Sequence, residues 1–138
     1  MSYEQRASTF LKQAWEHAFS SSPNPSNAYW LAVKAVEAVA IPAMDLNSPK
    51  PTLGGCIGQL KNAGKSWSFV LPGADDQDSL GQLRETMNLL WGSHHDRHGG
   101  IEDYKDVTEE EAQAAVLLAS TLVGWFSLGF FSRGKSGE

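Results

Sequence analysis

The sequence contains a single cysteine, Cys56, so an internal disulfide is excluded. Apolar and glycine residues surround this cysteine, which favours an inert, buried thiol over a nucleophile. Basic residues are also few, since 16 acidic side chains outnumber 11 lysines and arginines. The resulting net charge of −5 argues against a protein that coats nucleic acid through bulk electrostatics, but it does not exclude a small local phosphate site.

Targeting and membrane signals are weak as well. Residues 1–14 lack the basic start and apolar run of a signal peptide, so we expect a cytoplasmic protein. Residues 112–132 contain no charge, and this length approaches that of a bilayer-spanning helix. Polar side chains interrupt this segment, and alanine and glycine dilute it. It therefore predicts a central helix packed on all sides and no membrane partner.

Apolar residues recur at three- and four-residue intervals over most of the chain, which indicates helices. We expect helices over residues 3–19, from 26 or 27 to about 40 where Pro42 ends the helix, 53–62, from 78 or 79 to 95 or 98, and 108 to about 130. Only residues 67–71 have strand character, too short to found a sheet. The fold class predicted is all-α. Residues 1–138 should form a single-domain bundle of four to five helices with a central apolar C-terminal helix, and residues 1–2 and 132–138 should fray.

Three glycines, Gly54, Gly55 and Gly58, lie in the short third helix. They do not form a phosphate-binding P-loop, because no strand precedes them and no Gly-Lys-Ser/Thr ending follows. Residues 64–66 do read Gly-Lys-Ser, but Gln59 stands where such a loop needs its first glycine. We interpret the three glycines as points of close helix packing.

The chemically richest segment is residues 93–100, Ser-His-His-Asp-Arg-His-Gly-Gly. The apolar stripe of Leu83, Met87 and Leu90 continues at helical spacing to His94 and then to His98. If the helix persists, these two histidines share one face near its C-terminus, with a glycine stop at residue 99 or 100.

Three roles fit this cluster. The first is general acid–base catalysis on a phosphodiester, with His94 and His98 exchanging protons and Arg97, together with His95, holding the phosphate. The second is a metal site, in which His94 and His98 bind one ion and Asp96 or a distant carboxylate is the third ligand. The third is structural pairing at a helix end. We expect no cofactor. His17, on the first helix, is a secondary candidate for a functional histidine.

Several short motifs then resemble a known family. They are Glu37 in the second helix, Thr52-Leu53-Gly54, Arg97-His98-Gly99 at a helix end, and an apolar helix opened by Thr108 and three glutamates. Between about residues 28 and 126 this order resembles the C-terminal domain of bacterial abortive-infection proteins, which is similar to the HEPN superfamily of helical bundles. The resemblance implies phage defence or a toxin–antitoxin system, a metal-independent ribonuclease acting on RNA or nucleotides, and a homodimer.

The family signature places an arginine before the histidine with four to six residues between them, and here the pattern departs. Trp91, Gly92 and Ser93 stand at those positions, and Arg84 lies too far back. Two alternatives therefore stay open beside the ribonuclease. One is a non-catalytic interaction or dimerisation module that binds a protein partner, and the other is a metal-binding protein.

Overall fold

The computed structural model describes residues 1–63, 66–74, 78–99 and 106–134, with the side chains of residue 63 and of residues 95–99 outside that description. Within these ranges the chain forms five helices and a two-stranded sheet, which confirms the all-α prediction. The elements are α1 Tyr3–Phe19, α2 Pro25–Met44, α3 Leu53–Ala63, β1 Trp67–Phe69, α4 Ser79–Gly99, α5 Glu109–Ser127 and β2 Phe131–Arg133.

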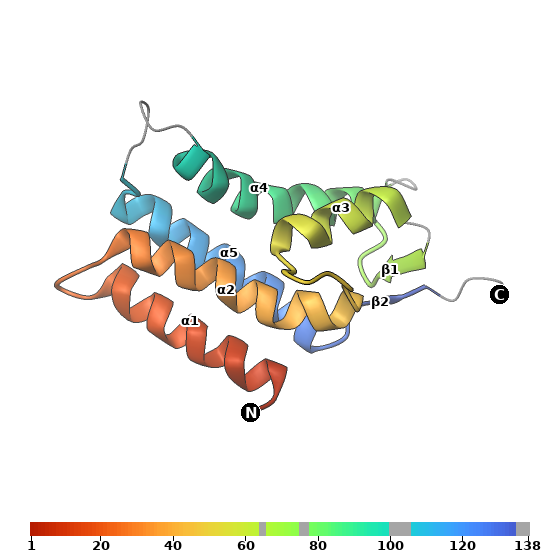
Figure 1. Ribbon diagram of the computed structural model, residues 1–138, viewed down its shortest axis with the longest axis horizontal. Coiled ribbons are helices and arrows are strands. Elements are labelled where there is room, and N and C mark those ends of the chain that lie inside the picture. Colours follow the sequence, from red (N-terminus) through yellow and green to blue (C-terminus); the bar gives the residue numbers. More distant parts are fainter. Residues whose placement is uncertain (64–65, 75–77, 100–105, 135–138) are drawn as a thin grey trace.

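The helices form two groups (Figure 1). Helices α1, α2 and α5 pack closely together, and α3 and α4 lie side by side over α2 and α5. Alanine and valine dominate the buried side of α2, and their small side chains let neighbouring helices approach closely. None of the helices, over the described residues, has the length and apolarity needed to cross a membrane.

The expectation of a central C-terminal helix packed on all sides is wrong in one respect. Helix α5 buries one face, from Ala112 to Phe126, but Leu117 on its outer side is 53% exposed. Helix α2 buries side chains along almost its whole length and contacts α1, α3, α4 and α5. The most enclosed helix is therefore α2, because it lies between the two groups.

Helix α2 also differs from the prediction at both ends. It begins with Pro25, capped by the side chain of Asn24, and it continues past Pro42 to Met44. A proline near a helix end removes only one backbone hydrogen bond. Here the last carbonyls still find donors, because the backbone N–H groups of Asp45 and Leu46 bond to the carbonyls of Pro42 and Ile41 at 3.1 Å. The left-handed conformation of Asp45 (φ 52°) then ends the helix.

The C-terminal segment was expected to fray from residue 132, and helix α5 was expected to reach Phe130. Instead α5 ends at Ser127, Gly129 turns the chain with φ 76°, and β2 pairs antiparallel with β1. The buried ring of Phe131 stacks on Trp67, with centroids 5.0 Å apart. This aromatic contact stabilises strands that have little intrinsic stability. Residues 135–138 lie outside the described part.

Candidate functional site

Helix α4 carries the predicted histidine cluster at its C-terminal end. The helix persists to Gly99, so His94 and His98 lie one turn apart, as the spacing predicted. Leu83, Met87 and Leu90 are buried, which confirms the stripe that leads to His94. The side chains of the other predicted site residues, His95, Arg97 and His98, and of Asp96, lie outside the described residues.

His94 itself is half-buried, and its ring stacks on the ring of Tyr29. The two ring centroids are 5.1 Å apart and the planes differ by 13°. Tyr29 is buried, and its hydroxyl donates to the backbone carbonyl of Leu90 at 2.7 Å. Tyr29 therefore fixes the C-terminal half of α4 against α2. No sequence motif includes this tyrosine, and it lies 61 residues away from Leu90, so sequence reasoning did not select it.

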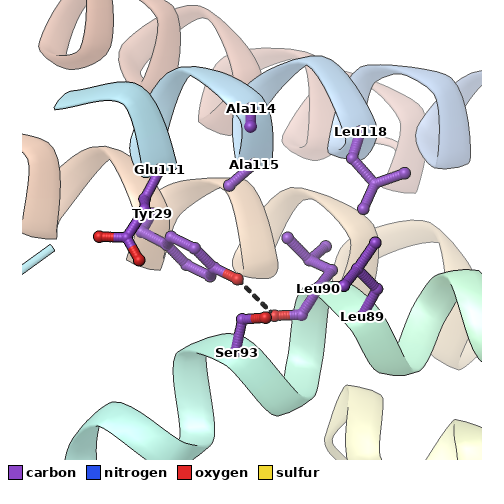
Figure 2. A pocket seen from close by; sticks show the side chains of 8 residues that line it. All are labelled: Tyr29, Leu89, Leu90, Ser93, Glu111, Ala114, Ala115 and Leu118. Carbon is purple, nitrogen blue, oxygen red and sulfur yellow. Dashed lines mark hydrogen bonds between the residues drawn. The ribbon is translucent and has the colours of Figure 1, made fainter. Parts of the chain in front are cut away.

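A pocket of about 340 Å³ opens between α4 and α5 next to Tyr29. Figure 2 shows side chains from α2, α4 and α5 lining it: Tyr29, Leu89, Leu90, Ser93, Glu111, Ala114, Ala115 and Leu118. Most of these groups are aliphatic, and Leu89 on the rim is 64% exposed. Such a lining suits an apolar ligand surface better than a phosphate.

A second pocket, of about 390 Å³, lies along the other half of the same helices. Ser79, Gln82, Leu83 and Thr86 of α4 and Trp125 of α5 contribute to it, with residues 69 and 71–73 at its end. In each helix the lining positions of both pockets recur at three- and four-residue spacing, so they share one face. We call this face of the two helices, with its two pockets, the α4–α5 groove.

One end of the groove is acidic. Glu109, Glu110 and Glu111 form the first turn of α5, and Glu111 lines the pocket. Glu111 also completes the predicted capping box: its carboxylate accepts from the backbone N–H of Thr108 at 2.9 Å, and its own N–H donates to the Thr108 hydroxyl at 3.1 Å. Negative charge here favours cationic partners and disfavours phosphate.

At two positions where the family signature expects arginine, the structure shows uncharged side chains that make other contacts. Trp91 is half-buried and packs on α3 against Gly54, where an added Cβ would lie 2.7 Å from its Nε1. Ser93, two residues on, is exposed and lines the pocket of Tyr29. Neither residue supplies the missing positive charge.

The other polar candidates have structural partners. Buried Glu37 accepts from the backbone N–H of Leu53 at 2.8 Å and pairs with Lys34 at 3.3 Å. His17 accepts from the side-chain amide of Asn27 at 3.0 Å, which links α1 to α2. Burial, followed by the negative charge of Glu37, raises the pKa of the Cys56 thiol to about 12, so it stays protonated and unreactive near neutral pH, as predicted.

Two further sequence motifs lie partly outside the residues that the structure describes. No group of three or more His, Cys, Asp or Glu side chains close enough to hold a metal ion occurs among the side chains that the structure describes. Residues 64 and 65 of the Gly-Lys-Ser tripeptide lie outside the described ranges.

Comparison of the chain with models of protein families, with curated proteins and with solved structures finds no match. The resemblance to HEPN domains therefore rests on the quoted motifs alone.

Proposed function

We propose that this chain is a HEPN-like, non-catalytic binding module, and that its α4–α5 groove receives an amphipathic helix of a partner protein. The observation that carries the proposal is the aliphatic lining of the pocket beside Tyr29, with Leu89 exposed at its rim. Grooves between two helices commonly take a third helix, whose apolar side chains enter at positions i, i+3 or i+4, and i+7.

Length and charge define the partner further. From Ser79 to Ser93 the groove follows 15 residues of α4, and the 14 steps between them correspond to about 21 Å at 1.5 Å per step. A partner helix of about four turns matches this length. Because Glu111 lines one end of the groove, the partner should carry lysine or arginine there and aliphatic side chains along its inner face.

Leu89→Glu should abolish most of this binding. A fluorescein-labelled peptide of about 15 residues, with leucines at helical spacing and lysines at one end, is the probe. We expect the substitution to weaken binding about tenfold or more in fluorescence anisotropy, because a charge would enter an apolar contact. Leu117→Glu is the matched control, since Leu117 is similarly exposed on α5 but does not line either pocket.

The charge argument has its own test. Glu111→Gln should weaken binding of the lysine-ended peptide and leave binding of a glutamine-ended peptide unchanged, and glutamine can still accept the capping hydrogen bond from Thr108. Glu16→Gln, an exposed position on α1, should change the binding of neither peptide. If Leu89→Glu and Leu117→Glu reduced the affinity for the peptide equally, this result would contradict a contact specific to the groove. A concentration-dependent dimer that Leu89→Glu dissociates would show that a second copy, instead of a partner helix, fills the groove.

A metal-independent ribonuclease is the second candidate. The helical backbone through Gly99 favours it, because it keeps the backbone positions of His94 and His98 one turn apart. In the reaction, one histidine would take the proton of the ribose 2′-hydroxyl as that oxygen attacks phosphorus. The other would protonate the leaving 5′-oxygen, and Arg97 would hold the phosphate.

If this activity exists, His98→Ala and Arg97→Ala should each abolish cleavage of single-stranded RNA in EDTA without much change in melting temperature. Product formation on denaturing gels measures it, and His17→Ala is the matched control because His17 lies on α1 and pairs with Asn27. Intact RNA after incubation with the wild type would reject the ribonuclease and leave the binding module standing.

A further inference from the structure

A third pocket, of about 240 Å³, lies on the opposite group of helices, where the start of α1 meets the end of α2. Its lining combines charged and apolar side chains: Tyr3, Arg6, Phe10, Lys34, Glu37, Ala38, Ile41, Pro42 and Pro51. None of these residues lines the α4–α5 groove. Any ligand bound here is therefore independent of the function proposed above.

The charges of this pocket are not balanced. Both carboxylate oxygens of Glu37 are engaged, one by Lys34 and the other by the backbone N–H of Leu53. Lys34 is engaged twice, because its ammonium group also lies 5.3 Å from the centre of the Trp30 ring. Arg6 is exposed and makes no ion pair with any residue in the described ranges. With two cations and one carboxylate, the lining keeps one positive charge.

The remaining surface of the pocket is apolar. Phe10, Ile41, Pro42 and Pro51 are all partly buried, so they form walls that stay in place. A cavity of about 150 Å³ is enough to hold a benzene ring. The pocket thus has room for one ring or a short branched chain with a charged group attached.

We propose that this pocket binds a small monocarboxylate with an apolar body. The guanidinium of Arg6 can meet the carboxylate with two parallel N–H donors, and Lys34, which also lines the pocket, adds to the positive potential. The apolar body then fills the space beside Phe10 and Ile41. A single excess positive charge matches a monoanion, whereas a phosphate dianion would remain undercompensated next to Glu37.

Phenylacetate is the test probe, measured by calorimetry and by amide chemical shifts. We expect a Kd of about 1 mM for a ligand of this size, with shifts concentrated at residues 6, 38 and 41. Arg6→Gln should raise this Kd about tenfold, because it removes a charge-assisted pair of hydrogen bonds. Arg6 is exposed, so the fold should survive, and circular dichroism checks this.

Three controls make the outcome decisive: one variant, Lys12→Gln, and two ligands, phenylacetamide and phenyl phosphate. Lys12→Gln removes an exposed cation of α1 that does not line the pocket, and it should leave the Kd unchanged. Phenylacetamide, neutral but of the same shape, should bind about tenfold more weakly. The proposal is overturned if phenylacetate fails to bind at about 10 mM, if the amide binds equally well, if phenyl phosphate binds more tightly, or if Lys12→Gln has the same effect as Arg6→Gln.

Discussion

Glu37→Ala should lower the free energy of unfolding by about 3 kcal/mol. Its carboxylate is the acceptor for the backbone N–H of Leu53, the first residue of α3, and Leu53 is fully buried. Alanine would leave this buried N–H without its acceptor, and it would also remove packing contacts of the Glu37 side chain. Urea denaturation followed by circular dichroism measures the loss.

Two matched variants separate the hydrogen bond from the ion pair. Glu37→Gln retains an oxygen that can accept from Leu53, so it should cost about 1 kcal/mol. Lys34→Gln should cost less than about 1 kcal/mol, because the lysine side chain is 41% exposed and the pair is screened by water. If Glu37→Ala were no more harmful than Lys34→Gln, the carboxylate would not be what holds α3 to α2.

Gly54→Ala and Gly58→Ala should change stability in opposite directions, although both lie in α3. A Cβ on Gly54 would come within 2.7 to 2.9 Å of the Nε1, Cε2 and Cζ2 atoms of Trp91, and this half-buried, rigid ring cannot withdraw without moving α4. Overpacking of this kind outweighs the gain in helix propensity, so we expect a net loss of about 2 kcal/mol.

Gly58 is the internal control for this effect. A Cβ there would meet no heavy atom within 4 Å, so alanine should stabilise the protein by about 0.5 to 1 kcal/mol through helix propensity alone. The two variants should therefore differ by about 3 kcal/mol in thermal or chemical denaturation. In a Trp91→Leu background, Gly54→Ala should lower the free energy of unfolding much less, because the ring that opposes the new methyl group is gone.

The glycines of α3 show what a local sequence pattern can predict and what it cannot. Close packing was predicted for three glycines and is present at Gly54 against Trp91 and at Gly55, where a Cβ would lie 3.0 Å from a methyl group of Leu46. It is absent at Gly58. A sequence shows which residues permit close approach, but the partner that approaches comes from another helix.

The candidate site was likewise predictable only in part. Helical spacing placed His94 at the end of the buried stripe of α4, and the structure agrees. The stacking of His94 on Tyr29 and the pocket between Leu89 and Leu118 had no signal in the sequence. These features join α2, α4 and α5, and nothing in the local sequence of one helix specifies which face of another it will meet.

The sequence by itself determined the helices and most of their starts. Their apolar periodicity is a property of consecutive residues, and caps such as the Thr108–Glu111 box act within one turn. Tertiary structure alone decided that Phe131 and Trp67 bring two short strands together, and that α4 and α5 leave a groove between them. Each of these depends on free energy from contacts between residues far apart in the chain, which can override or complete a weak local preference.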